Sequence, residues 1–358
     1  MIAPALVPGH LMHRSAIRQL RRLTTAGRRG KSGHDRRLLR AAAVLRLIVV
    51  RLLAAVPVLF VVSLFSFGLT LLVPGDIAAE LAGQSASSEE VDRIRSQLGL
   101  NQPPLERMAS YYLGLAQGDL GRSILLNQSV SSAILERLPV TLSLTMIGLG
   151  LAALVGVPLG LLAAARAHGW QDQSAMGAAL VGLSLPDFWL GLLLIWVLGV
   201  KLQWLPTGGF VPFTTDPVGW LRSIAMPAGV LALTQMGPLA RMTRSAALEV
   251  AGSDFIRTAR AKGLAEPRVF ARHVLAAAAV PILTVAGIGF GIALGGALVI
   301  EQVFSLPGVG RLVIGAVLRR DWPVIQGGLL LTAIVFVAVN LIVDLLYLWV
   351  DPRLREER

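Results

Sequence analysis

The sequence contains no cysteine among its 358 residues. Without cysteine the chain has no disulfide framework, no thiolate metal site and no cysteine nucleophile. Charged residues are also scarce: Asp, Glu, Lys and Arg make up 15% of the chain, against about 25% in soluble proteins. Hydrophobic residues make up 54%, and the mean hydropathy is +0.68. This composition excludes an ordinary water-soluble enzyme, and it also excludes a chain that is disordered throughout.

Paired titratable groups are missing from the long apolar runs of the sequence. All five histidines lie outside these runs, and the only acidic residues inside them are Asp187 and Asp344. The metalloprotease pattern HExxH and the hydrolase pattern GxSxG are absent, and the apolar runs contain no carboxylate pair at helical spacing. The sequence therefore predicts no catalytic residue, no metal site and no cofactor-binding residue in this chain.

The positive charge is concentrated at the N-terminus. Residues 1–42 hold ten Lys or Arg and one acid, so they carry +9 of the net charge of +12. Because the basic charge is confined to this segment, we expect no nucleic-acid binding. We expect a disordered cytoplasmic tail, since it lacks apolar periodicity and precedes an apolar helix. Its Thr25 to Ser32 stretch lacks the first glycine of a Walker A loop and follows no apolar strand, so we expect no nucleotide binding there.

Six apolar runs are long enough to cross a membrane, which takes about 20 residues of helix. They are Leu52 to Val73, Leu138 to Ala165, Gln173 to Val200, Ser223 to Ala240, Val274 to Ile300 and Trp322 to Val350. The fourth run is the weakest, because it contains Pro227 and Pro238. The sequence thus predicts an all-α, polytopic integral membrane protein with six transmembrane helices.

Loop charges predict the orientation of these helices, because Lys and Arg favour the cytoplasmic side. The predicted cytoplasmic parts are the tail 1–42, the loop 241–273, with seven basic residues against three acids, and the C-terminal residues 351–358. The segment 74–137 carries five Arg against eight acids and is predicted to be periplasmic. The loop 301–321 goes mildly against the rule, since it contains Arg311, Arg319 and Arg320 on the outer side. In this division, 43–73 is the first transmembrane helix and 138–350 forms a five-helix core.

The loop 241–273 contains the most specific motif. Its residues 254–264 read DFIRTARAKGL and resemble the cytoplasmic EAA loop of binding-protein-dependent ABC importer permeases, in the form typical of the dipeptide, oligopeptide and nickel family. The general EAA pattern has Glu at the position of Arg257 and Pro thirteen residues after the glycine, whereas Pro281 follows Gly263 by eighteen. The resemblance covers about 44–355, and the basic tail has no counterpart in it. Other segments similar to family landmarks, in the family's order, are Val73 to Asp76, Gly118 to Ser123, Leu183 to Gly191, Trp204 to Pro206, Val303 to Gly308 and Asp344 to Arg353.

This resemblance implies a type I ABC importer permease in the bacterial inner membrane, with both termini cytoplasmic. It implies pairing with a second homologous permease, two ATP-binding subunits that bind ATP and Mg, and a periplasmic solute-binding protein. The implied substrate is a di- or oligopeptide. The implied ATPase-docking residues, on a short helix that Gly263 would end, are Asp254, Arg257, Thr258, Ala259, Arg260, Ala261, Lys262, Gly263 and Leu264.

Several alternatives stay open at this stage. The same family includes permeases for nickel, glutathione and oligosaccharides. An ion-coupled secondary transporter would use buried acids such as Asp187 and Asp344, but we expect Asp187 to cap a helix break after Pro186, and Asp344 to belong to a polar packing seam. The fifth run carries Gly287, Gly291 and Gly295, a spacing that lets helices pack closely.

Overall fold

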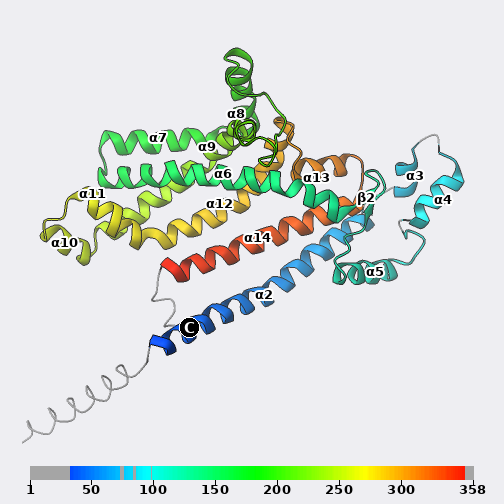
Figure 1. Ribbon diagram of the computed structural model, residues 1–358, viewed down its shortest axis with the longest axis horizontal. Helices are drawn as coiled ribbons and strands as arrows, with labels where there is room; N and C mark the ends of the chain where they lie inside the picture. The colour runs from blue at the N-terminus through cyan, green and yellow to red at the C-terminus, as the bar shows by residue number, and fades with distance from the viewer. Residues whose placement is uncertain (1–32, 73–75, 84–85, 98, 351–358) are drawn as a thin grey trace, which may run out of the picture. The chain divides into compact units, whose positions relative to one another are not determined.

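The computed structural model describes residues 33–72, 76–83, 86–97 and 99–350 (Figure 1). The elements of the N-terminal part are α2 (Gly33–Leu72), α3 (Ile77–Ala82), α4 (Ser88–Gln97), α5 (Pro104–Ala116), β1 (Arg122–Ser123) and β2 (Gln128–Ser129). The rest is helical: α6 (Val130–Ala165), α7 (Trp170–Ser184), α8 (Asp187–Leu194), the π-helical η1 (Ile195–Lys201), α9 (Pro217–Ala251), α10 (Asp254–Ala261), α11 (Glu266–Arg268), the π-helical η2 (Val269–Val274), α12 (Leu275–Val303), α13 (Val309–Leu318) and α14 (Trp322–Val350). The all-α fold predicted from the sequence is confirmed, apart from the two-residue antiparallel pairing of β1 with β2.

The chain divides into two compact units, residues 1–52 with 353–358 and residues 53–352. In the smaller unit, the described residues 33–52 form the first half of α2. Residues 33–42 are therefore helical, against the expectation of disorder, because their Arg, Leu and Ala residues are good helix formers. The rest of the predicted tail, including Thr25 to Ser32, lies outside the described residues, as does the C-terminal segment 351–358.

Five of the predicted membrane spans are single helices. They occupy Val44–Leu72, Val130–Ala165, Pro217–Ala251, Glu266–Val303 and Trp322–Val350. The third predicted span is instead divided into α7 and the α8–η1 segment, which meet at an angle of 97°. The break lies at Leu185 and Pro186: Leu185 is extended (φ −92°, ψ 128°), as a residue before proline prefers. Within the described residues, the count is thus five unbroken spans, or six with the bent pair.

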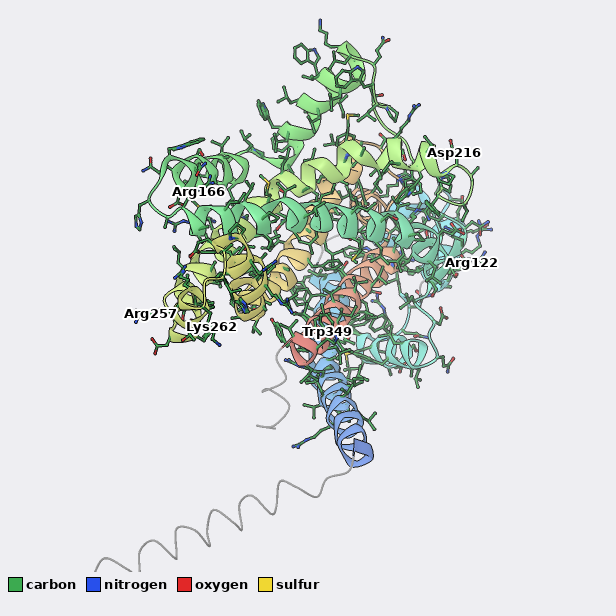
Figure 2. All side chains as sticks on the ribbon, turned by 60° about the vertical axis from the view of Figure 1, so that its left-hand side comes forward. Arg122, Arg166, Asp216, Arg257, Lys262 and Trp349 are labelled. Atoms are coloured by element: carbon green, nitrogen blue, oxygen red, sulfur yellow. The ribbon has the colours of Figure 1, made fainter. Side chains whose placement is uncertain are left out.

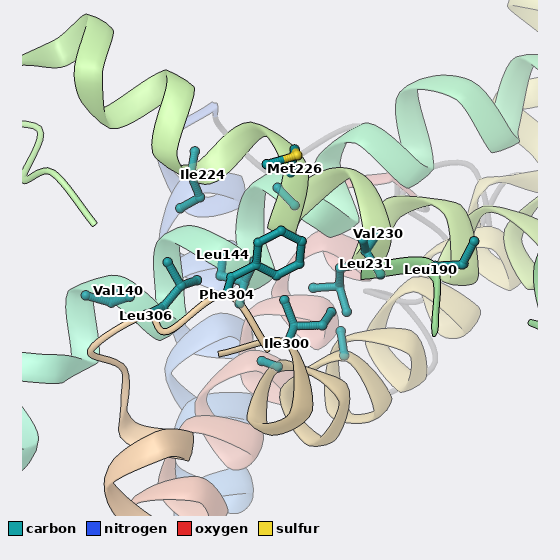
Figure 3. Packing of buried hydrophobic residues seen from close by; sticks show 13 residues of the cluster. Val140, Leu144, Leu190, Ile224, Met226, Val230, Leu231, Ile300, Phe304 and Leu306 are labelled. Carbon is teal, nitrogen blue, oxygen red and sulfur yellow. The ribbon is translucent and has the colours of Figure 1, made fainter. Parts of the chain in front are cut away.

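The weakest predicted span is the centre of the larger unit. The most apolar part of α9 has a mean hydropathy of only 1.2 but is 61% buried, whereas that of α14 has 2.6 and is 6% buried. A helix surrounded by protein does not need the apolar surface that lipid demands of an exposed helix. Figure 3 shows the main hydrophobic core, in which Leu144 of α6, Leu231 of α9 and Ile300 of α12 are buried around Phe304.

Close helix contacts in this unit depend on glycine. On α6, a Cβ at Gly156 would lie 2.9 Å from the Met236 carbonyl oxygen, so α6 and α9 touch through backbone. On α12, a Cβ at Gly287 would lie 3.0 Å from a Val343 methyl group, and one at Gly291 only 2.5 Å from the Phe336 ring, both on α14. At Gly295 a Cβ would meet no described atom within 4 Å. Two of the three glycines singled out from the sequence thus lie at the α12–α14 contact.

The long helices of the larger unit run between two ends that are formed by different elements. Figure 1 shows α10 and α11 at one end, and α13 and the β1–β2 hairpin at the other. Figure 2 shows the same division: Arg166, Arg257 and Lys262 lie at one end, and Arg122 and Asp216 at the opposite end.

Candidate coupling site

The segment that resembles the EAA loop folds as α10, packed on one hydrophobic anchor. A helix of eight residues is not stable by itself in water, so it needs tertiary contacts. Ile256 supplies them, because its side chain is fully buried. It belongs to a cluster drawn from the ends of α6 and α9 and from η2, namely Ala164, Ala247, Val269, Phe270 and Val274. This cluster fixes which face of α10 points inward.

The C-terminus of α10 is closed by a Schellman motif. Gly263 has a φ of +77°, the left-handed conformation that residues with a Cβ rarely adopt. Its N–H donates to the Arg260 carbonyl oxygen at 2.9 Å, and the N–H of Leu264 donates to the Ala259 carbonyl oxygen at 3.4 Å. Leu264 then packs against the anchor cluster. Gly263 therefore both ends the helix and turns the chain back toward the protein.

Arg260 holds the loop together from inside the chain. Its Nε donates to Oε1 of Glu266 at 2.6 Å, and its second terminal nitrogen donates to Oε2 at 3.3 Å. The other terminal nitrogen donates to the carbonyl oxygen of Ala251 at 3.2 Å. One guanidinium therefore joins α10 to α11 and to the end of α9, so its expected role at a partner's surface is not its only role.

The outward face of α10 carries the remaining predicted residues. Arg257 is 71% exposed, and within the described part of the chain its guanidinium makes only a long contact of 3.5 Å with Asp254, which is 98% exposed. Thr258 is exposed and donates through its hydroxyl to the Asp254 carbonyl oxygen at 2.9 Å, Ala259 is half-buried, and Ala261 and Lys262 are exposed. Phe255, which was not singled out from the sequence, adds an aromatic ring that is 53% exposed. Figure 2 shows Arg257 and Lys262 at the end of the larger unit opposite Arg122 and Asp216.

An ion pair with a buried carboxylate joins α7 to α9 close to this loop. Arg244 of α9 donates to both carboxylate oxygens of Asp172 in α7, at 2.5 and 2.6 Å, and the Asp172 side chain is 5% exposed. The same carboxylate accepts the His168 N–H at 2.9 Å. The pair fixes the α6–α7 connection to α9, one turn before Ala247 of the anchor cluster. Nothing in the sequence pattern pointed to this pair, since its members are 72 residues apart.

The two intramembrane acids have different surroundings. Asp187 is the first residue of α8, directly after the break. The proline before it is the N-cap and no side-chain hydrogen bond caps the helix, so the expected capping by Asp187 is not found. A Cβ at Gly296 would lie 2.9 Å from the Asp187 Oδ2. Asp344 is half-buried on α14. One turn along, the Tyr347 hydroxyl donates to the Thr284 hydroxyl of α12 at 2.8 Å, so this stripe of α14 takes part in helix packing. Within the described residues no three His, Cys, Asp or Glu side chains are grouped as a metal site would require.

Comparisons with known proteins decide the family. The family described as "Binding-protein-dependent transport system inner membrane component" matches residues 156–356, and the N-terminal component of the same membrane proteins matches residues 44–145. The chain belongs to this family. This ABC importer permease is therefore an inner-membrane protein with several spans, and the secondary-transporter alternative loses its basis.

Individual relatives agree with this assignment. A Brucella abortus (strain 2308) protein named "Putative peptide transport system permease protein" is 48% identical over 309 residues, covering 86% of this chain and 98% of its own. The glutathione transport system permease protein of Escherichia coli (strain K12) is 39% identical over an alignment that covers 87% of this chain and 99% of that protein. The dipeptide transport system permease protein of Alkalihalophilus pseudofirmus is 38% identical, covering 85% and 98%. The solved MetNI methionine ABC transporter shares the fold, with a TM-score of 0.52 at 17% identity over 61% of this chain and 95% of that one.

Sequence reasoning singled out the candidate coupling segment α10 but missed the contacts that hold it. Ile256 could have been found from its place on an amphipathic helix, because its neighbours in the sequence are polar on the opposite face. The Arg260–Glu266 contact has no such signal, since it spans a turn whose geometry depends on Gly263. Asp172 and Arg244 give no signal in a single sequence.

Proposed function

We propose that this permease forms, with a second homologous permease, the membrane path for a di- or oligopeptide. A periplasmic binding protein delivers the substrate, and two partner subunits bind ATP and Mg and hydrolyse the ATP. This chain itself has no catalytic role and binds no cofactor. The observation that carries the proposal is α10: a short helix anchored by one buried residue, with its opposite face exposed and unoccupied by the described chain.

The peptide assignment is supported by the chemistry named for the relatives. Three of them are named for the transport of peptides, dipeptides or glutathione, and glutathione is itself a tripeptide. The orientation with both termini and α10 in the cytoplasm is supported by the loop charges. In that orientation α10 faces the ATPases, and the end with α13 and the hairpin faces the binding protein.

Uptake of a labelled tripeptide tests this proposal directly. Vesicles containing the complete transporter, with the binding protein outside, should accumulate the tripeptide only when ATP is present inside. Ionophores that collapse proton and sodium gradients should leave the initial rate unchanged, because hydrolysis rather than an ion gradient drives the step. Uptake that persists without ATP and stops with ionophores would show an ion-coupled transporter instead.

A charge swap separates two possible roles of Arg260. Arg260→Glu sets two carboxylates against each other across the α10–α11 turn, so the ATPases should co-purify poorly. If Arg260 acts by positioning α10, adding Glu266→Arg restores the ion pair and should recover co-purification. Recovery should fail if Arg260 binds the ATPase directly, because the partner would still meet a glutamate. Arg257→Glu provides the contrast: it lies on the exposed face, so the swap at position 266 should not rescue it.

A further inference from the structure

A cavity of about 350 Å³ lies at the end of the larger unit opposite α10. Its apolar walls include Leu126 of the hairpin and Leu312 of α13, and three arginines line it: Arg137, Arg311 and Arg319. A volume of this size, with apolar walls and a few charged groups, is typical of small-molecule sites.

Two of these arginines, Arg311 of α13 and Arg319 at its C-cap, have no side-chain partner within the described residues. Arg311 lies in the first turn of α13, Arg319 directly follows its last residue, and both are exposed. Within the described residues, neither guanidinium makes a hydrogen bond or an ion pair. Arg137 is only partly engaged: it donates to the Ala133 carbonyl oxygen at 2.7 Å and lies 3.6 Å from the Glu136 carboxylate.

The only acid in the lining does not neutralise this charge. Asp321 is 4% exposed, and its carboxylate accepts hydrogen bonds from the Ser123 hydroxyl and the Val324 N–H. Burial raises the pKa of its carboxyl group, which these hydrogen bonds only partly oppose. With three arginines against this one acid, the lining carries a net positive charge.

Buried polar contacts hold the cavity walls in place. The fully buried Glu301 carboxylate accepts a hydrogen bond from the backbone N–H of Arg311 at 2.9 Å. The Thr141 hydroxyl accepts one from the backbone N–H of Val309, also at 2.9 Å. The start of α13 is therefore fixed to α12 and α6. The Ser123–Asp321 contact fixes the hairpin to the start of α14. The arginines thus project from a preorganised frame, which lowers the entropic cost of binding a ligand.

The position of these arginines in the membrane protein suggests that they bind a ligand. In the proposed orientation the cavity opens outside the cytoplasm, where Lys and Arg are disfavoured in short loops. Guanidinium groups bind carboxylates through paired, charge-assisted hydrogen bonds. We propose that this cavity binds the C-terminal carboxylate of the peptide substrate on the extracytoplasmic side of the permease. This inference rests on the proposed function, both for its orientation and for the substrate class.

Cysteine protection tests the site, because the natural chain has no cysteine. Gly315→Cys places a thiol in the lining, where a Cβ meets no described atom within 4 Å. The complete transporter, in nanodiscs without binding protein, is labelled with a thiol reagent in the presence of trialanine or of its C-terminal amide. Trialanine should slow labelling, and the amide should not.

Matched arginine variants identify the groups responsible. In the Gly315→Cys background, Arg311→Gln or Arg319→Gln should raise the trialanine concentration needed for half-protection by about tenfold or more, as expected for loss of one charge-assisted hydrogen bond. Arg222→Gln removes the same charge from an exposed site at this end of α9 and should leave protection unchanged. Equal protection by acid and amide, or no effect of the arginine variants, would exclude a carboxylate site.

Further arms separate other occupants and other failures. Protection that needs the binding protein rather than trialanine would identify a protein-docking surface, and protection that follows the content of anionic lipid would identify a headgroup site; either result overturns the proposal. Labelling of Gly315→Cys, but not of Ala261→Cys, by an impermeant reagent in intact cells checks the orientation. If trialanine protects the thiol but the vesicles take up no peptide, the transport proposal fails while the carboxylate site stands.

Discussion

Replacing Gly263 with valine should reduce transport about tenfold or more while the protein still inserts and accumulates in the membrane. The residue adopts a φ of +77°, and a Cβ in this conformation costs about 1–2 kcal/mol, more for a β-branched side chain. No described atom lies within 4 Å of the added Cβ, so the cost is conformational rather than steric. The strain falls on the two hydrogen bonds of the Schellman motif, and loss of a few docking contacts at an interface can cost about 2 kcal/mol.

A neighbouring glycine supplies the control. Gly252 lies between α9 and α10 with a φ of −80°, and a Cβ there would make an ordinary contact of 3.6 Å with the Glu249 carbonyl oxygen. Gly252→Ala should therefore transport normally, Gly263→Ala should be impaired, and Gly263→Val should be impaired most. The measurements are uptake rate, ATPase co-purification and membrane abundance. Equal activity of Gly263→Val and Gly252→Ala would rule out the helix end as part of the coupling element.

The contrast between these two glycines shows what the sequence could predict at the site. The position of Gly263 after a helix of eight residues was enough to predict a C-terminal cap, because helix ends commonly use glycine there. The amphipathic pattern of α10 could have pointed to Ile256 as the inward residue. The cluster that Ile256 packs into and the internal contact of Arg260 could not be predicted, since both depend on how α10 folds back onto η2 and α11. The sequence therefore singled out the segment, but the contacts that hold it became known only from the packing.

For the membrane helices, too, the sequence predicted the positions but not the packing. Hydropathy located every membrane helix, because burial in lipid requires about 20 apolar residues whatever the packing. It could not identify α9 as the central helix, since a low hydropathy reads as a weak span until its protein neighbours are known. The break after Pro186 was expected from the sequence, but its angle of 97° depends on tertiary contacts, because Pro139 and Pro158 lie inside the continuous helix α6.

Glu301→Ala should destabilise the end of the protein that carries α13 more than most single substitutions. The carboxylate is fully buried; it accepts the Arg311 N–H at 2.9 Å and the Thr141 hydroxyl at 2.6 Å. Alanine leaves both donors without a partner, and each unsatisfied buried donor costs about 1–3 kcal/mol. The Glu301 carboxylate also packs closely against Gly310, because a Cβ at Gly310 would lie 2.9 Å from its Oε2.

A graded series tests whether Glu301 acts through these hydrogen bonds. Thr141→Val keeps the side-chain volume but leaves the Val309 N–H unpaired, and Glu301→Gln keeps one acceptor for the Arg311 N–H, so both should be milder than Glu301→Ala. Thermal unfolding of the purified transporter should rank the variants in that order, and the labelling rate of a cysteine at Gly315 should rise in parallel as α13 loosens. If Glu301→Ala unfolds at the same temperature as the unchanged protein and the labelling rate does not rise, the carboxylate does not hold α13. The start of α13 would then be fixed by its apolar contacts with α12 and α14.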